Sequence, residues 1–262
     1  MEGTLWVLGS SGWMPRAGQE TSCFLLEAHG DRGSELVMLD AGTGTSNLTM
    51  VKEVLARHDR MHVLLSHYHL DHTVGLMYLK RFCANKRVDV WGPGVPAYPR
   101  RTESYVRDLL QDAAYSSGPT GLAREVAYHD YGGEDFEVGG IPVRVRPQRH
   151  SSPSFELRVG DLVTYATDTS FDPAAWRDSP QSHLLLHECW QLSDGDARHT
   201  SLEALSKGLP RDRFRKIVLV HQNPAWSADE RYAVSGLAAA NGMTLAHDGM
   251  RLELRLRRKN TH

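Results

Sequence analysis

The chain has 262 residues, of which 40% are hydrophobic and 24% charged, a composition typical of a globular protein that is long enough to bury a full core. Its net charge of -2 at pH 7 provides no overall attraction to nucleic acid or to an anionic membrane, so an anionic substrate has to be bound locally. The three cysteines are widely separated and are expected to be reduced thiols, as in a cytosolic protein. The N-terminus has no basic segment with a long apolar core, and no apolar run reaches the ~18 residues of a membrane span. We therefore expect a soluble cytoplasmic protein.

The first part of the chain predicts three strands and a short helix. Apolar runs at 4–8, 22–28 and 35–39 are separated by glycine-containing turns, as strands commonly are. From about 47 to 57, apolar residues recur at helical spacing. Asp40 follows the third strand directly, and the glycines after it allow a close approach of the backbone.

The most informative stretch is His-Tyr-His-Leu-Asp-His at 67–72, which follows the apolar run 61–65 and is rich in side chains that can bind a metal. In an extended segment His67 and His69 lie on the same side and can bind one ion. Asp71 and His72 fall where the pattern changes to a helix and can be aimed at a second ion. Imidazole and carboxylate ligands together favour zinc, manganese or iron over calcium.

The rest of the chain predicts further strands and helices. A strand at 88–91 precedes a helix at 100–115 and a loop at 116–121, and a hairpin at 136–145 turns at Gly139-Gly140. Later strands are expected at 155–159, 162–167, 184–186, 216–220, 244–246 and about 252–256, with helices at 200–207 and 228–240. Because there is no linker or repeat, we expect one α/β domain over residues 1–262, with two packed sheets flanked by helices.

Several of these strands end in residues that can bind a metal or transfer a proton. His150 follows the hairpin, Asp168 follows the run 162–167, Glu188 follows 184–186, and His221 follows 216–220. Residues at the carboxyl ends of strands in an α/β protein often line one common site. The sequence therefore predicts a single site at the strand ends.

The motif His67-x-His69-x-Asp71-His72, followed by the strand-end residues and His199, resembles the pattern of the metallo-β-lactamase fold superfamily. Within it, the chain is most similar to the ribonuclease Z-like phosphodiesterase branch. The resemblance spans nearly the whole chain and implies an αββα sandwich of two mixed β-sheets.

The resemblance also implies two divalent metal ions, with Zn²⁺ favoured and Mn²⁺ or Fe²⁺ as alternatives. One ion would be held by His67, His69 and His150. The second would be held by Asp71, His72 and His221, and Asp168 would bridge the two ions. Asp40 would orient one of the ligand histidines.

The resemblance assigns a catalytic role to Asp71, His199 and Glu188. Two neighbouring ions can hold a bridging hydroxide as the nucleophile, so no serine or cysteine nucleophile is needed and Cys189 is expected to be a packing residue. The stretches 186–189 and 198–200 resemble paired motifs of ribonuclease Z-like phosphodiesterases, in which a glutamate orients the histidine that protonates the leaving oxygen. Alternatively, His199 only precedes the helix at 200–207, with Thr200 as its cap.

One departure from the branch concerns the substrate. Members that process transfer RNA often carry a long basic arm between the third histidine and the bridging aspartate, whereas residues 151–167 are taken up by two strands and a turn. We therefore expect a small, anionic substrate, such as a cyclic nucleotide, and neither a long nucleic acid nor a membrane as a partner.

Two alternative functions remain. One is an acyl hydrolase of lactones, esters or thioesters, and the other is a metal-binding protein without hydrolytic activity. Dimers are frequent in the family, so a homodimer is an expectation from resemblance alone.

A few other residues carry weaker expectations. Arg144, Arg146 and Arg149 could form a phosphate-facing patch, although a basic strand face is more often solvated. Trp13 and Tyr68 lie in or beside expected site loops and could stack on a base or line an apolar pocket. The basic cluster at 255–259 is expected to be a solvated tail. The other histidines of interest are expected to be structural or surface residues: His58, His62, His129, His183, His187 and His247.

Overall fold

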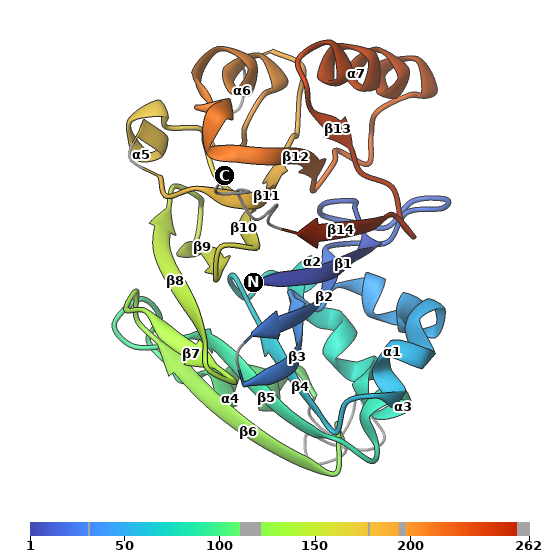
Figure 1. Ribbon diagram of the computed structural model, residues 1–262, viewed down its shortest axis with the longest axis vertical. Helices are drawn as coiled ribbons and strands as arrows, with labels where there is room; N and C mark the ends of the chain where they lie inside the picture. Colours follow the sequence, from blue (N-terminus) through green and yellow to red (C-terminus); the bar gives the residue numbers. More distant parts are fainter. Residues whose placement is uncertain (31, 111–121, 178, 194–197, 256–262) are drawn as a thin grey trace, which may run out of the picture.

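Two seven-stranded β-sheets form the centre of the molecule, and helices lie on the outer side of each (Figure 1). The computed structural model describes residues 1–30, 32–110, 122–177, 179–193 and 198–255. The expected loop at 116–121 and the residues 256–259 of the expected basic tail lie outside the described residues.

The first sheet has the strand order β14-β1-β2-β3-β4-β5-β6. Antiparallel pairing joins β14, β1, β2 and β3, and parallel pairing joins β3 to β6. The bounds are β1 (Glu2–Gly9), β2 (Cys23–Gly30), β3 (Gly33–Leu39), β4 (Arg60–Leu64), β5 (Arg87–Pro93), β6 (Glu125–Tyr131) and β14 (Arg251–Arg255).

The second sheet has the strand order β13-β12-β11-β10-β9-β8-β7. Here β7 to β10 pair antiparallel and β10 to β13 pair parallel. The bounds are β7 (Phe136–Val138), β8 (Ile141–Gln148), β9 (Ser154–Val159), β10 (Val163–Ala166), β11 (Ser182–Glu188), β12 (Phe214–Val220) and β13 (Thr244–Leu245).

The helices between the strands are mostly short. In the first half they are η1 (Thr43–Val51), α1 (Lys52–Ala56), α2 (Leu70–Thr73), η2 (Val74–Tyr78), α3 (Leu79–Cys83) and α4 (Thr102–Leu109). In the second half they are α5 (Pro173–Arg177), α6 (Leu202–Gly208), η4 (Arg211–Arg213) and α7 (Ala228–Ala240). None of the helices in the described part of the chain is both long and apolar enough to cross a membrane.

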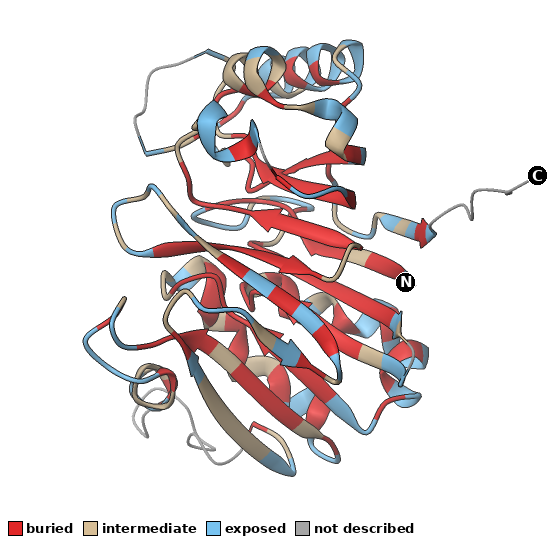
Figure 2. Cartoon of the chain, turned by 60° about the vertical axis from the view of Figure 1, so that its left-hand side comes forward, coloured by how far each residue is buried: buried red, intermediate tan, exposed pale blue. Residues whose placement is uncertain are grey.

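The hydrophobic core has three layers that follow this architecture. One cluster, with Phe24 and Leu186, fills the space between the two sheets. A second packs the first sheet against α1, α3 and α4, and a third packs the second sheet against α5, α6 and α7. Figure 2 shows the buried residues concentrated along the central strands. This helix–sheet–sheet–helix order confirms the expected αββα sandwich.

Every expected strand has a counterpart in the structure, with bounds that differ by a few residues. In the β7–β8 hairpin, Gly139 and Gly140 have φ angles of 58° and 84°, which glycine adopts without strain. Along β8 the buried Val143 and Val145 alternate with exposed or half-buried arginines, as the pattern predicted.

The structure differs from the expectations at three elements. The sequence did not predict β6, because most of its residues are only half-buried at the edge of the sheet and its apolar pattern is weak. The expected helix at 47–57 is divided between the end of the 3₁₀ helix η1, whose Asn47 and Thr49 are poor α-helix formers, and the α-helix α1. The short helix α5 was not expected either.

Candidate metal centre

The predicted site residues lie at the ends of strands from both sheets. Asp40 follows β3, and the motif 67–72 connects β4 to α2 and includes its first residues. On the other sheet, His150 follows β8, Asp168 follows β10, Glu188 ends β11 and His221 follows β12. Because the parallel strands of each sheet end at the same edge, these side chains are brought together at that edge.

Three of these residues have a positive φ angle, a backbone conformation that residues other than glycine rarely adopt. The φ angles are 53° for Asp40, 49° for Asp168 and 47° for His221. A left-handed conformation costs a non-glycine residue about 1–3 kcal/mol, and such residues are concentrated at functional sites. At each strand end the backbone therefore turns sharply, at a cost in stability that the surrounding structure offsets.

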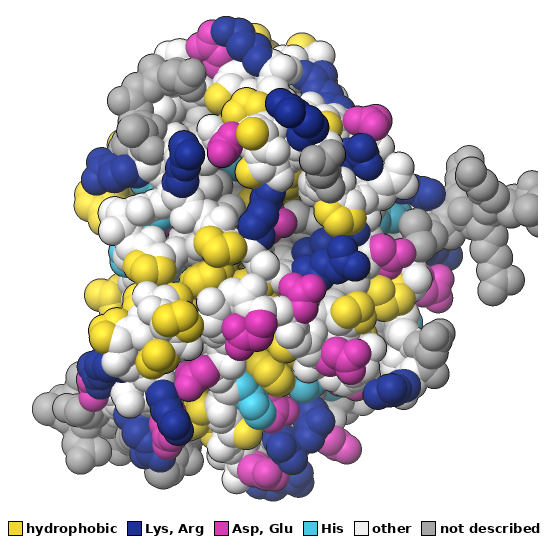
Figure 3. Space-filling view, turned by 90° about the vertical axis from the view of Figure 1, so that its left-hand side faces the viewer, with side chains coloured by type: hydrophobic (Ala, Val, Ile, Leu, Met, Phe, Trp, Pro, Cys, Tyr) yellow, Lys and Arg dark blue, Asp and Glu magenta, His cyan; other side chains and the backbone are white. Residues whose placement is uncertain are grey.

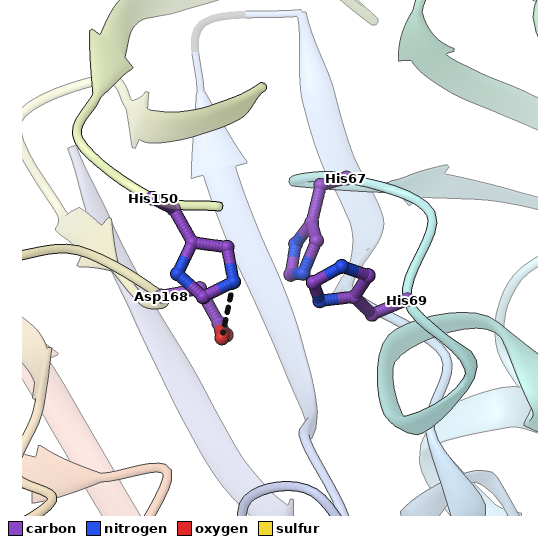
Figure 4. A group of neighbouring side chains, drawn as sticks. All are labelled: His67, His69, His150 and Asp168. Atoms are coloured by element: carbon purple, nitrogen blue, oxygen red, sulfur yellow. Dashed lines mark ion pairs between the residues drawn. The ribbon is translucent and has the colours of Figure 1, made fainter. Parts of the chain in front are cut away.

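The first cluster of possible metal ligands consists of His67, His69, His150 and Asp168 (Figure 4). Each of the four residues has one ligand atom within 4.8 Å of those of the others. Nε2 of His150 lies 3.3 Å from Oδ1 of Asp168, the contact drawn as a dashed line in Figure 4. Three imidazoles and one carboxylate form a suitable donor set for a divalent transition metal.

The second cluster consists of Asp71, His72 and His221, whose ligand atoms also lie within 4.8 Å of one another. Asp168 reaches this cluster with its other oxygen, because Oδ2 lies 2.9 Å from Nε2 of His72 and 3.1 Å from Nε2 of His221. Asp168 thus presents one oxygen to each cluster. This is the geometry that a bridging carboxylate requires.

A buried carboxylate, Asp40, lies behind both clusters. Its Oδ2 accepts hydrogen bonds of 2.7 Å from Nδ1 of His72, 2.8 Å from the Ser66 hydroxyl and 2.7 Å from the Tyr165 hydroxyl. Since the Ser66 hydroxyl donates to Asp40, it accepts from Nδ1 of His67, 3.0 Å away. In their neutral form both histidines therefore carry the proton on Nδ1, and Nε2 keeps the lone pair that a metal needs.

The electrostatics of the site also favour bound cations. Nε2 of His67 is buried without a hydrogen-bond partner among the described residues. Burial lowers the pKa of His67 well below its ordinary value. Burial would also lower the pKa of His72, but the neighbouring carboxylates of Asp71, Asp168 and Asp40 outweigh it and raise this pKa well above the ordinary value. Divalent ions would balance these carboxylates while the histidines stay neutral, so the residues fit a metal centre.

Glu188 and His199 form a pair beside the second cluster. Oε2 of the fully buried Glu188 accepts a 2.9 Å hydrogen bond from Nδ1 of His199, and its Oε1 accepts one from the backbone N–H of Thr169. Burial raises the pKa of Glu188, and the bond from His199 opposes this rise. His199 also lies in a group of ligand atoms with Asp168 and His221 and is stacked on Trp190 at a ring distance of 4.7 Å.

The cap of α6 is not Thr200, the residue named in the alternative interpretation of His199. The Ser201 side chain accepts a hydrogen bond from the backbone N–H of Ala204 and so caps the helix. The Thr200 hydroxyl instead donates a 2.6 Å hydrogen bond to the carbonyl of Thr169. The alternative in which Thr200 supplies the cap is therefore wrong.

A cavity of about 390 Å³ opens onto both clusters. His67 and His72 are fully buried and do not line it, whereas the other predicted ligands do. Its lining residues are Trp13, His69, Asp71, His150, Ser151, Asp168, Trp190, Arg198, His199 and His221. The cavity therefore gives a small substrate access to the clusters and to His199.

Several residues of the site were not singled out from the sequence. Ser66 and Tyr165 bind Asp40, Trp190 stacks on His199, and the Ser152 hydroxyl lies 3.1 Å from Nε2 of His69. Ser66 and Ser152 are close in sequence to predicted ligands, which is the signal that could have identified them. Trp190 and Tyr165 lie two and three residues from Glu188 and Asp168, so the same signal was present for them.

Tyr68 does not line the cavity at the clusters. Its ring stacks on Tyr105 at 4.1 Å, and its hydroxyl lies 3.0 Å from the carbonyl of Pro93 and 2.9 Å from Oγ1 of Thr102. It lines a separate, smaller cavity of about 180 Å³ with mainly apolar residues. The suggestion that Tyr68 stacks on a base at the site is therefore wrong, whereas Trp13 does line the site cavity.

The three arginines do not form one patch. Arg146 pairs with Glu156 and lies over the ring of Trp176, and Arg144 lines the same cavity as Arg146, away from the clusters. Arg149 borders a groove that includes His150.

Among the other histidines, His58 binds Glu27, His187 packs against Trp176, and neither belongs to a group of possible metal ligands in the described residues.

Comparisons with solved structures show the fold. The metallo-β-lactamase fold protein YhfI of Bacillus subtilis has a TM-score of 0.72 at 18% identity, covering 97% of this chain and 100% of that chain. A diphosphatase of the PhnP family has a TM-score of 0.73 at 18% identity, covering 97% and 98%. The short form of human tRNase Z has a TM-score of 0.69 at 16% identity, covering 97% and 100%.

Comparisons of sequence identify relatives. The ribonuclease Z of Methanopyrus kandleri is 26% identical over 156 residues, which are 58% of this chain but only 48% of that protein, so the match spans about half of its length. The ribonuclease Z of Pyrococcus horikoshii is 21% identical over 252 residues, covering 76% of this chain and 80% of that protein. These matches confirm the resemblance to the ribonuclease Z-like branch. The family described as anti-Pycsar protein Apyc1 matches residues 5–243, and this chain therefore belongs to that family and has the metallo-β-lactamase fold.

Proposed function

We propose that this protein is a metal-dependent phosphodiesterase that hydrolyses a small or cyclic phosphodiester, with a cyclic nucleotide as the favoured substrate. The observation that carries the proposal is the Glu188–His199 pair, which lies beside Asp168 where the two ligand clusters meet. Membership of the anti-Pycsar protein Apyc1 family supports a cyclic nucleotide, and the ribonuclease Z relatives support hydrolysis of a phosphodiester bond.

The ligand clusters define where the metal ions would be held. His67, His69 and His150 would hold one ion, Asp71, His72 and His221 would hold the other, and Asp168 would be shared. We expect Zn²⁺ for this mixture of imidazole and carboxylate donors, with Mn²⁺ or Fe²⁺ as alternatives. When bound, two such ions activate water as the nucleophile and stabilise the negative charge that develops on the phosphoryl group.

His199 would protonate the leaving oxygen. Its Nδ1 donates to Oε2 of Glu188, so Nε2 is the nitrogen that remains to deliver a proton in the cavity. The Glu188 carboxylate supports the charged form of the imidazole before the transfer. An alkoxide leaves phosphorus slowly unless an acid protonates it, and a positioned acid typically accelerates such a step by roughly 10²–10⁴-fold.

The charge distribution favours a small substrate over a long nucleic acid. The net charge is -2, and on the face drawn in Figure 3 basic and acidic side chains are interspersed. A protein that binds a polyanion usually has a broad basic surface, which guides association. Between His150 and Asp168 the chain forms β9 and β10, which leaves no interval there for a basic arm.

A substrate screen tests the proposal. The purified protein, analysed for metal, is assayed with cyclic nucleotides, linear dinucleotides, aryl phosphodiesters, lactones and thioesters. Hydrolysis of phosphodiesters is expected, and the Asp168→Ala variant should lose it, which excludes a contaminating enzyme. The half-buried Asp172, which pairs with Arg149 outside the ligand clusters, provides the matched control Asp172→Ala. Turnover of lactones or thioesters alone would favour the alternative, an acyl hydrolase that uses the same metal centre.

A further inference from the structure

We infer that Trp13 is the residue that stacks on the planar base of the substrate and so distinguishes a nucleotide from other phosphodiesters. This inference rests on the proposed phosphodiesterase function and concerns the recognition of the part of the substrate that does not react. It is carried by the exposure of the Trp13 ring, its place in the cavity and the way in which its backbone is fixed to the site.

The exposure of Trp13 is unusual for a residue of its size. Its relative exposure is 69%, although tryptophan is among the most strongly buried residue types on average. It lines the cavity of about 390 Å³ together with Asp71, Asp168 and His199. A large apolar ring is thus left uncovered at the place where the substrate would enter.

The backbone around Trp13 is tied directly to the ligand clusters. The N–H of Trp13 donates a 2.7 Å hydrogen bond to Oδ2 of Asp71, and the N–H of Gly12 donates a 2.9 Å bond to the carbonyl of Gln222. A Cβ atom at Gly12 would lie 2.5 Å from the ring of His221, so the loop approaches this candidate ligand as closely as glycine permits.

The conformation of Trp13 is strained, which indicates a functional constraint. Its φ angle is 59°, in the left-handed region that a bulky residue rarely adopts. Such strain persists only where the surroundings hold the residue in place, and it is concentrated at active sites and ligand clamps. Here the backbone hydrogen bonds to Asp71 and Gln222 hold the loop, so the backbone of Trp13 is fixed beside the candidate metal ligands.

The other tryptophan of the cavity has a different role. Trp190 is half-buried and stacks on His199, with ring planes inclined at 21°, so its ring supports the proposed acid. The ring of Trp13 has no aromatic partner among the described residues. Trp13 is therefore the tryptophan whose ring is free to stack on the flat face of a base. Every purine and pyrimidine base has such a face.

The first test compares two substrates that differ only in the base. The metal-loaded full-length enzyme is assayed with a cyclic nucleotide and with the corresponding cyclic phosphate of ribose without a base. For the cyclic nucleotide, Trp13→Leu should raise KM by about 5- to 150-fold with little change in kcat, the effect of losing one base–aromatic contact. For the base-free substrate KM should not change.

Two further variants separate stacking from other effects. Trp13→Phe keeps an aromatic ring and should restore most of the affinity that Trp13→Leu loses. Met14→Ala changes the exposed neighbour, which does not line the cavity, and should leave both substrates unaffected. Calorimetric titration gives a readout besides activity, because Trp13→Leu should weaken binding of a nucleoside monophosphate but not of ribose phosphate.

The possible failures can be distinguished. If the wild-type protein hydrolyses no phosphodiester, the proposed function and this inference are both overturned. If it hydrolyses cyclic nucleotides but Trp13→Leu changes KM equally for both substrates, or for neither, the phosphodiesterase function stands and the role of Trp13 is overturned. Equal defects in Trp13→Phe and Trp13→Leu would likewise exclude stacking.

Discussion

The hydroxyl of Tyr165 donates a 2.7 Å hydrogen bond to Oδ2 of Asp40 and thereby joins the two sheets at the metal centre. Tyr165 is in β10 of the second sheet, three residues before Asp168, whereas Asp40 follows β3 of the first. The same Asp40 oxygen binds His72 and Ser66. Ligands supplied by different sheets are thus held by one buried network.

The first prediction concerns Tyr165→Phe. In this variant Oδ2 of the buried Asp40 loses one of its hydrogen-bond donors, so the free energy of unfolding should fall by about 1–3 kcal/mol. Because Asp40 orients ligand histidines, metal affinity should also fall, by about 10–100-fold as for other partners of metal ligands. Urea unfolding and competition with a chromogenic chelator measure the two effects.

Tyr131→Phe provides a matched control. Tyr131 is equally buried, its hydroxyl donates to the carbonyl of Leu65, and no hydrogen bond from Tyr131 to Asp40 is present among the described residues. It should lose stability but keep metal affinity. Similar metal affinities in both variants would show that the Tyr165 hydroxyl contributes only to folding.

The second prediction compares the two aspartates of the centre. Asp168→Ala should abolish turnover and weaken binding of both ions, since one oxygen of Asp168 faces each cluster. Asp40→Ala should have a smaller effect, about 10–100-fold in affinity or activity, because Asp40 acts through His72 and Ser66. Elemental analysis after dialysis, combined with kinetics, distinguishes them. An Asp168→Ala variant that keeps both ions and full activity would disprove the bridging role.

The third prediction is a stoichiometry of about two transition metal ions per chain, because three or four protein ligands suffice for one ion and the clusters contain seven candidates. Removal of the ions by a chelator should lower the melting temperature, since bound metal stabilises only the folded state. Elemental analysis and thermal unfolding with and without chelator check both points. Saturation at one ion with full activity would contradict a dinuclear centre.

The fourth prediction concerns the pH dependence of stability far from the metal centre. Burial would raise the pKa of Glu27, but the neighbouring His58 and Arg57 outweigh it and lower this pKa below its ordinary value. A lowered pKa in the folded state stabilises the protein above the unfolded-state pKa, and this stabilisation is lost as the pH falls through the folded-state pKa. The difference in unfolding free energy between the wild type and Glu27→Gln should therefore shrink as the pH is lowered from neutral into the acid range. Urea unfolding over that range measures it, and a difference that stays constant would contradict the assignment.

The positions of the site residues could largely be predicted from the sequence because metal ligands follow apolar strands. The apolar runs before His67, Asp168 and His221 clearly predict strands. Parallel strands bring their carboxyl ends to one edge of a sheet, and this does not depend on how their side chains pack. The fold followed from the same pattern. The polar edge strand β6 was missed because most of its residues are half-buried, which leaves no clear alternation of apolar and polar residues.

Contacts between distant segments could not be predicted in this way. The bond between Asp40 and Tyr165 joins residues 125 positions apart, and its formation depends on how the two sheets are packed. Trp13 and Tyr68 are both close in sequence to expected site loops, yet only Trp13 lines the cavity, because the ring of Tyr68 packs between Tyr98 and Tyr105. Local sequence indicates that a residue is near a site, but tertiary packing decides which way its side chain points.

The last prediction concerns His199, whose role separates a phosphodiesterase from a general metal-dependent hydrolase. With Glu188 bound at Nδ1, His199 can give a proton from Nε2 to a leaving sugar oxygen. His199→Ala should therefore lose roughly 10²–10⁴-fold in kcat on a cyclic nucleotide, the usual range for a general acid. On a p-nitrophenyl phosphodiester the loss should be much smaller, because p-nitrophenolate leaves without a proton.

The ratio between the two substrates is the decisive measurement, since a variant that merely unfolds or loses metal would lose both activities equally. Glu188→Gln keeps the shape of the side chain but removes the charge that supports the protonated imidazole, so it should show the same bias more weakly. The exposed His29 at the end of β2 gives the control His29→Ala, which should behave as the wild type on both substrates. Equal losses on the two substrates in His199→Ala would leave His199 with a structural role, and the chemistry of the centre would then be better explained by acyl hydrolysis.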